Sequence, residues 1–155
     1  MIIMAYKGVG KRELAKKRLD IIDLDADQLF RDGSRPWNWE EIYVGCAVCL
    51  SKQGYIVLIS SQVGVQDVVH RIKEPVYAVI PSLKMKDIWV EKLKKRWQRT
   101  EKRSDKKEYF DAKAYYRIEI EQIIAEKDIF KELWIIDTMS YDFEEIIENF
   151  ALETN

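Results

Sequence analysis

The sequence predicts a three-layer α/β/α fold, in which a five-stranded parallel sheet lies between two layers of helices. Five short, mostly apolar runs rich in β-branched residues alternate with segments whose apolar residues recur at helical spacing. This alternation is typical of parallel strands joined by right-handed helical crossovers. With 155 residues, 47% of them hydrophobic, the chain is long enough to bury one core, so we expect a single domain over residues 1–155.

The first two strands flank a glycine-containing turn. We expect a strand at residues 2–6, which is apolar throughout like a strand covered on both faces, and a second strand at residues 20–25. The turn and a short lysine-rich helix at residues 13–19 lie between them. Side chains alternate along a strand, so Asp23 and Asp25 are expected to share one face at the end of the second strand.

The middle of the chain contains a helix, a strand and a shorter helix. Asn38 with Glu41 three residues later resembles a capping box, and Gly54 is a typical helix end. The third strand is expected at residues 55–59. The short helix after it is closed by Pro75.

The two cysteines have C-x-x-C spacing, which is found in redox and zinc sites. Cys46 and Cys49 recur at helical spacing with Trp39, Ile42 and Tyr43, which indicates a shared apolar face. The sequence has no second pair of this kind. We therefore predict that both are small buried groups in a reducing compartment, without a metal or redox role.

The last part of the chain supplies two further strands, at residues 76–80 and 133–137. Ser82 is expected to cap a long helix that passes into a basic stretch, and a further helix is expected at residues 107–126. A final helix follows Ser140. The single histidine is expected at the surface, and the tryptophans near the capped helix receive no assignment.

The overall charge excludes some partners. The formal net charge is −1, which argues against a dedicated nucleic-acid or membrane binder. No apolar run approaches the roughly 18 residues of a membrane span. We expect a soluble, cytoplasmic protein with no membrane partner, for which nucleic acid is a possible but not a favoured ligand.

Residues 5–12 match part of the phosphate-binding pattern G-x-x-x-x-G-K-[S/T], in which backbone N–H groups and the lysine cradle phosphates. Gly10 and Lys11 occupy their expected positions. Ala5 replaces the first glycine, and Arg12 replaces the hydroxyl residue that holds Mg²⁺. A strand before the loop and a helix after it are the context that this pattern requires.

With this context, the chain resembles P-loop kinases of the nucleoside monophosphate kinase type, most closely the small kinase-like proteins common in phage genomes. The stretches that carry the resemblance are Gly8-Val9-Gly10-Lys11, Ile22-Asp23-Leu24-Asp25, residues 55–61, and Pro81 followed by residues 91–96. The resemblance implies a nucleotide or another small phosphate-bearing ligand, with ATP as the phosphoryl donor.

The resemblance also implies roles for individual residues. Lys11 would contact the β- and γ-phosphates of ATP. Asp23 or Asp25 would orient the acceptor at the edge of the sheet or hold magnesium through water. The implied ATP-binding residues are Gly8, Val9, Gly10, Lys11, Arg12 and Arg103. The implied catalytic residues are Lys11, Asp23, Asp25, Arg96 and Arg99.

A basic stretch at about residues 92–113 looks like the lid of such kinases, whose arginines close over the transferring phosphoryl group. Arg96 matches the family position best, Arg99 and Arg103 follow it, and Lys92 stands where an arginine is more usual. The same stretch contains carboxylates, so a solvated helix surface is an equal alternative.

Two positions lack the residue that would bind magnesium, which makes magnesium a doubtful cofactor. Arg12 replaces the loop hydroxyl, and the third strand ends in Ser60 and Ser61 instead of a carboxylate. Asp23 and Asp25 are the only candidate ligands left in this region, and we assign no metal ligand. Arg12 indicates either that a guanidinium replaces the metal or that catalysis has been lost.

Three function classes fit these observations. The first is a kinase that transfers the ATP γ-phosphate to a nucleotide or similar small acceptor. The second is a catalytically degenerate pseudo-kinase that acts by binding nucleotide, phosphate or a protein partner. The third is a nucleic-acid 5′-end kinase or binder that uses the basic stretch.

Overall fold

Five parallel strands form one sheet, in the order β2-β3-β1-β4-β5, in the computed structural model, which describes residues 1–154. The strands are β1 (Ile2–Ala5), β2 (Ile21–Asp23), β3 (Ile56–Ser60), β4 (Val76–Pro81) and β5 (Glu132–Ile136). The central strand β1 pairs with β3 and β4, and Ile2 lies opposite both Val57 and Val76. The predicted α/β class and five-stranded parallel sheet are confirmed.

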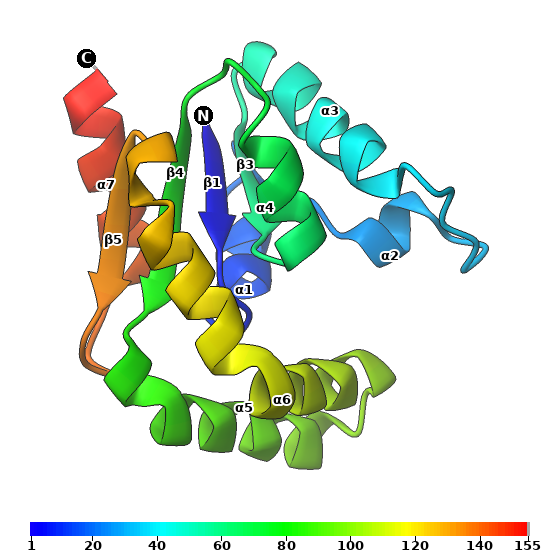
Figure 1. The fold of residues 1–155 in the computed structure, drawn as a ribbon, viewed down its shortest axis with the longest axis vertical. Helices are drawn as coiled ribbons and strands as arrows, with labels where there is room; N and C mark the ends of the chain where they lie inside the picture. Colours follow the sequence, from blue (N-terminus) through cyan, green and yellow to red (C-terminus); the bar gives the residue numbers. More distant parts are fainter. Residues whose placement is uncertain (155) are drawn as a thin grey trace.

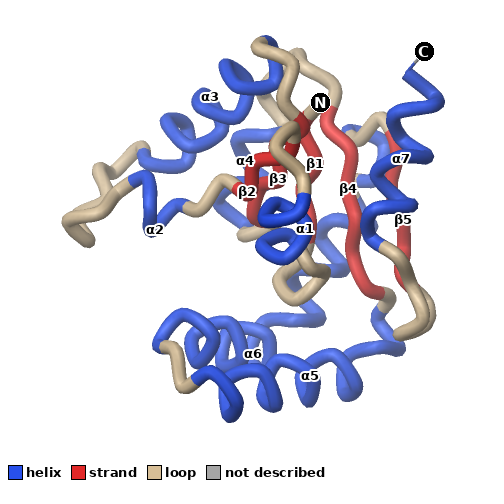
Figure 2. The backbone as a smooth tube through the Cα atoms, turned by 180° about the vertical axis from the view of Figure 1, so that it is seen from behind, coloured by secondary structure: helices blue, strands red, loops and turns tan. Residues whose placement is uncertain are grey.

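Helices cover both faces of the sheet. In Figure 1, α3 (Trp39–Lys52), α4 (Val63–Val69) and the C-terminal half of α6 (Arg103–Ala125) lie on the near side. The view from behind in Figure 2 shows α1 (Lys11–Lys17) and α7 (Phe143–Thr154) on the other face. The two remaining helices, α2 (Ala26–Leu29) and α5 (Lys86–Thr100), lie at the periphery of the sheet.

Burial explains the composition of the strands. Every residue of β1 and β4 is buried, because helices cover both faces of these strands and neither strand is at an edge. The edge strand β5 is mostly half-exposed. The first strand is thus covered on both faces, as its continuous apolar run predicted.

Helices α5 and α6 form a hairpin below the sheet, at the end toward which the strand arrows point (Figure 1). In the sequence, the hairpin follows β4 and precedes β5, and it contains the predicted basic stretch. Trp97 of α5 stacks on Tyr109 of α6, with ring centroids 5.7 Å apart. Trp89 and Leu93 of α5 are fully buried. The basic stretch is thus attached to the core by an apolar stripe.

Several predicted boundaries need correction. Strand β2 ends at Asp23, and Asp25 is the N-cap of α2, where its side chain accepts a hydrogen bond of 2.9 Å from the N–H of Asp27. Ser82 precedes a single 3₁₀ turn instead of capping α5 directly. Helix α6 begins at Arg103, four residues earlier than predicted.

The predicted burial of the cysteines is wrong, since Cys46 is half-buried and Cys49 is exposed. Tyr43, Val44 and Ala47 are the buried residues of α3, so the face toward the core is rotated away from the two cysteines. The histidine prediction is confirmed, because His70 is exposed and lies 3.0 Å from Glu126. No helix within residues 1–154 is both long and apolar enough to cross a membrane.

Candidate functional site

The glycine loop, residues 7–10, connects the central strand β1 to α1 at the carboxyl edge of the sheet. Gly8 has a backbone φ of +85° and Gly10 one of +115°. Residues other than glycine rarely adopt φ angles in this range. Gly8 is also tightly enclosed, since a Cβ atom there would lie 2.9 Å from Leu93 Cδ2 and 3.0 Å from Trp89 Nε1. Glycine is required at Gly8 for both reasons.

Three side chains donate hydrogen bonds to the carbonyls of residues 7–9 in the glycine loop. The indole N–H of Trp89 donates to the first at 2.8 Å, the ammonium of Lys92 to the second at 2.7 Å, and the hydroxyl of Tyr141 to the third at 2.9 Å. The rings of Trp89 and Tyr141 stack, and Lys92 lies 4.4 Å from the Trp89 ring centroid. The loop conformation is therefore fixed by side chains from α5 and from the connection between β5 and α7.

The glycine loop borders a cavity of about 370 Å³, which we call the loop cavity. Its charged lining is predominantly basic. The basic lining residues are Lys7, Lys11, Arg12, Lys16, Lys92, Arg96, Arg99 and Lys102, and the acidic ones are Glu13, Asp23, Asp105 and Glu108. A cavity with this excess of cations is suited to an anion that carries several negative charges.

Lys11 begins α1 and points back along the end of β1, where its ammonium donates a hydrogen bond of 2.8 Å to the carbonyl of Ala5. Burial lowers the pKa of Lys11, and nearby Asp23 opposes that shift. Burial raises the pKa of Asp23, whereas Lys11 acts to lower it and Asp25 to raise it further. Lys11 and Asp23 are thus close enough to affect each other's protonation.

A second, smaller cavity of about 120 Å³, the Asp23 cavity, adjoins the first. Its lining includes Asp25 and Arg35, which follow β2, and Ser60, the last residue of β3. The residues that line both cavities are Lys7, Lys11, Arg12, Asp23 and Glu108. Lys11 and Asp23 therefore lie where the two cavities meet.

The end of β3 is occupied by hydrogen bonds. The hydroxyl of Ser61 donates to Glu119 of α6 at 2.8 Å, and Glu119 lies 3.7 Å from the ammonium of Lys7. Burial raises the pKa of Glu119. The sequence interpretation missed Glu119, although a glutamate beside Tyr116 and Ile120 in an apolar helical stripe is a recognisable signal.

Asp105 in the first turn of α6 is 1% exposed, which contradicts the solvated-surface alternative for this residue. Its carboxylate lies 3.2 Å from Arg96 Nε and 4.0 Å from Arg12 Nη1, and it accepts a hydrogen bond of 2.5 Å from the Thr100 hydroxyl. Arg96 also pairs with Glu108. One buried carboxylate therefore orients guanidinium groups from both α1 and α5.

The other predicted arginines lie in different places. Arg99 lines the loop cavity beside Arg96. Arg103 does not line that cavity. It lies in a groove of about 1070 Å³ at the tip of the α5–α6 hairpin, the tip groove, together with Trp97 and Phe110.

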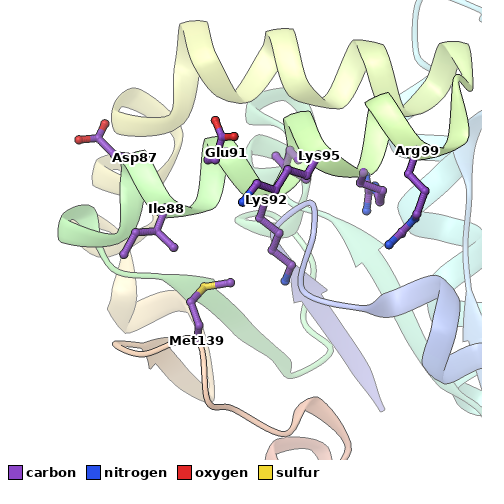
Figure 3. A pocket seen from close by; sticks show the side chains of 9 residues that line it. Asp87, Ile88, Glu91, Lys92, Lys95, Arg99 and Met139 are labelled. Atoms are coloured by element: carbon purple, nitrogen blue, oxygen red, sulfur yellow. The ribbon is translucent and has the colours of Figure 1, made fainter.

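A further groove of about 660 Å³, the α5 groove, lies beside the loop cavity (Figure 3). Ile88 of α5 and Met139, from the connection between β5 and α7, lie on opposite sides of it, and Lys92 extends from α5 toward the glycine loop. Lys92, Arg96 and Arg99 line both this groove and the loop cavity. The apolar part of the groove is thus continuous with the basic cavity.

The structure brings together most of the residues singled out in the sequence. The predicted site residues that line the loop cavity are Gly8, Val9, Gly10, Lys11, Arg12, Asp23, Arg96 and Arg99. Asp25 lines the adjoining Asp23 cavity, and Arg103 stands apart. Their roles remain predictions. No family model matches the chain, and no curated protein matches it at a significant level.

Proposed function

We propose that this chain is a P-loop kinase-like phosphotransferase, which binds ATP at the glycine loop and transfers its γ-phosphoryl group to a nucleotide or similar small acceptor. The observation that carries the proposal is the position of Lys11 and Asp23 between two adjoining cavities, one of them strongly basic. Both cavities lie at the carboxyl edge of a parallel sheet, where ligands of open α/β folds bind.

The charges favour a transfer from the loop cavity to the Asp23 cavity. Lys11 and the arginines Arg96 and Arg99 would stabilise the negative charge that spreads over the γ-phosphoryl oxygens during transfer. Asp23 would orient the attacking oxygen of the acceptor and accept its proton when the acceptor is a hydroxyl. The bond from that oxygen to the γ-phosphorus forms, the bond from the γ-phosphorus to the β,γ-bridging oxygen breaks, and ADP leaves.

The α5 groove is the natural place for the nucleoside of ATP. It adjoins the loop cavity through Lys92, Arg96 and Arg99, and the exposed side chains of Ile88 and Met139 supply apolar surface for a base.

A second candidate function is a pseudo-kinase that binds nucleotide or phosphate without transferring it. It is favoured by Arg12, which stands at the metal-ligand position, and by Ser61, whose hydroxyl is bonded to Glu119. A nucleic-acid 5′-end kinase is a third candidate, because the tip groove combines Trp97 and Phe110 with basic residues.

Calorimetric titration with ATP tests the proposal. Lys11→Met should weaken ATP binding by about a hundredfold, because it removes a charged hydrogen bond to phosphate. Lys17→Met is the matched control, since Lys17 is an exposed lysine of the same helix and does not line the cavity; it should bind like the wild type. Equal binding by the wild type and Lys11→Met would refute the proposal.

Labelled ATP then separates the candidate functions. Nucleoside monophosphates and 5′-hydroxyl oligonucleotides serve as acceptors, and transfer to a monophosphate supports the kinase. Transfer to an oligonucleotide supports the third candidate. ATP binding without transfer to any acceptor supports the pseudo-kinase.

A further inference from the structure

The residues at the expected metal position do not fit Mg²⁺, which takes carboxylate, hydroxyl and water oxygens as ligands. Arg12 follows Lys11 where a hydroxyl residue would be needed, and its guanidinium repels a cation. At the end of β3, the Ser61 hydroxyl is bonded to Glu119. Across residues 1–154, no group of three or more His, Cys, Asp or Glu side chains is placed to share a metal ion.

Two guanidinium groups line the same cavity, one of them that of Arg12. Arg12 of α1 and Arg96 of α5 both line the loop cavity and approach the same oxygen of Asp105, at 4.0 and 3.2 Å. A guanidinium has five N–H donors. Asp105 uses one nitrogen of each arginine and Glu108 one more nitrogen of Arg96, so both arginines retain donors that can bind phosphate oxygens.

The charge of the cavity wall also favours an anion without a bound metal ion. Eight basic and four acidic residues line the loop cavity, which gives a formal excess of four positive charges. A metal-free nucleoside triphosphate carries about four negative charges at neutral pH. The wall therefore balances the free anion, and a bound Mg²⁺ would add positive charge beside Arg12.

We infer that the loop cavity binds a polyphosphate as its metal-free anion, with the paired guanidinium groups of Arg12 and Arg96 in the place of Mg²⁺. This inference rests on the proposed function for the location of the polyphosphate. It adds that the ligand is the uncomplexed nucleoside triphosphate, or inorganic triphosphate with the same chemistry.

The test compares ATP and inorganic triphosphate, each titrated into the full chain in EDTA and in excess Mg²⁺. The wild type should bind at least as tightly in EDTA as in Mg²⁺. Arg12→Ser restores a hydroxyl at the metal position. It should weaken binding in EDTA by about tenfold or more, because charged hydrogen bonds are lost, and Mg²⁺ should recover part of that loss. Arg117→Ser is the control, because Arg117 is exposed on α6 and lines neither cavity.

Wild-type binding that is measurably weaker in EDTA than in Mg²⁺ would overturn the inference without any need for a variant. Arg12→Ser that binds like the wild type in EDTA would also overturn it. In both cases the proposed function survives if Lys11→Met still weakens ATP binding by about a hundredfold. A wild-type chain that binds neither ligand in either buffer refutes the inference and the proposed function together. A loss of binding in Arg117→Ser as large as that in Arg12→Ser would also overturn the inference, because the loss would then not depend on the position of the arginine.

Discussion

The glycine loop and the α5–α6 hairpin border the same cavity but are held by different interactions. The loop is fixed by glycine backbone conformations and by hydrogen bonds to three consecutive carbonyls. The hairpin places its cations by pairing them with carboxylates, most of all Asp105. The conformation of the glycine loop therefore depends on close packing around its backbone. The positions of the hairpin cations depend on their ion pairs, which single substitutions can remove.

The largest expected effect tests the shape of the loop. Gly8→Ala should lower the free energy of unfolding by about 2–4 kcal/mol, because backbone strain adds to a clash with Leu93 and Trp89. Gly10→Ala is the matched control. It has a positive φ as well, but no atom lies within 4 Å of its added Cβ, so strain alone should cost about 1–2 kcal/mol. Urea denaturation measures both values.

Equal losses in the two variants would show that backbone strain dominates and that the enclosure of Gly8 by α5 contributes little. A larger loss for Gly10→Ala would contradict the packing described for the loop.

The next effect tests the ion pairs of the hairpin. Asp105→Asn should lower the free energy of unfolding by about 2–3 kcal/mol, because it leaves Arg96 and Arg12 without their shared buried carboxylate. This value is below that for a fully buried pair, since the two arginine side chains are 30% and 43% exposed. Urea denaturation of the purified variant measures the change.

Glu108→Gln is the control for Asp105→Asn, because Glu108 pairs with the same arginine but its side chain is 33% exposed. Its loss should cost less than about 1 kcal/mol, since water solvates the partners of surface pairs. A larger loss of unfolding free energy for Glu108→Gln than for Asp105→Asn would show that Glu108, and not Asp105, is the carboxylate that stabilises the hairpin.

The same contrast explains what the sequence could predict. The strand order along the chain and the turn that follows the central strand depend on local patterns, such as Gly10-Lys11 after an apolar run, and the structure confirms them. The short helix α2 was not predicted, because its four residues are too few to form a recognisable pattern. The partners of Lys7 and Arg12 could not be predicted, because Glu119 and Asp105 are far away in the sequence and meet them only through the packing of α6. The cysteines of α3 were misplaced because an apolar stripe does not fix which edge of it faces the core.

Lys92 belongs to both regions, since it lies on α5 and bonds a carbonyl of the glycine loop. Burial and the nearby Arg96 lower its pKa to about 8. The unfolded chain should titrate near the ordinary lysine pKa of about 10.4, so it binds more protons than the folded chain between these values. The Lys92 contribution to the free energy of unfolding therefore rises with pH across this window. Deprotonation of Lys92 would not unfold the chain, so a loss of ligand binding in this window would have another cause.

The smallest expected effect follows from this titration. The affinity for ATP in EDTA should fall severalfold between pH 7 and 9, because Lys92 loses a charge beside the cavity while the phosphates, with a second pKa of about 6, do not change. Lys92→Arg stays charged and should flatten the profile, whereas Lys92→Met should be weak and flat throughout. A wild-type profile that stays level, or an equal slope in Lys92→Arg, would show that Lys92 holds the loop without contributing charge to the ligand.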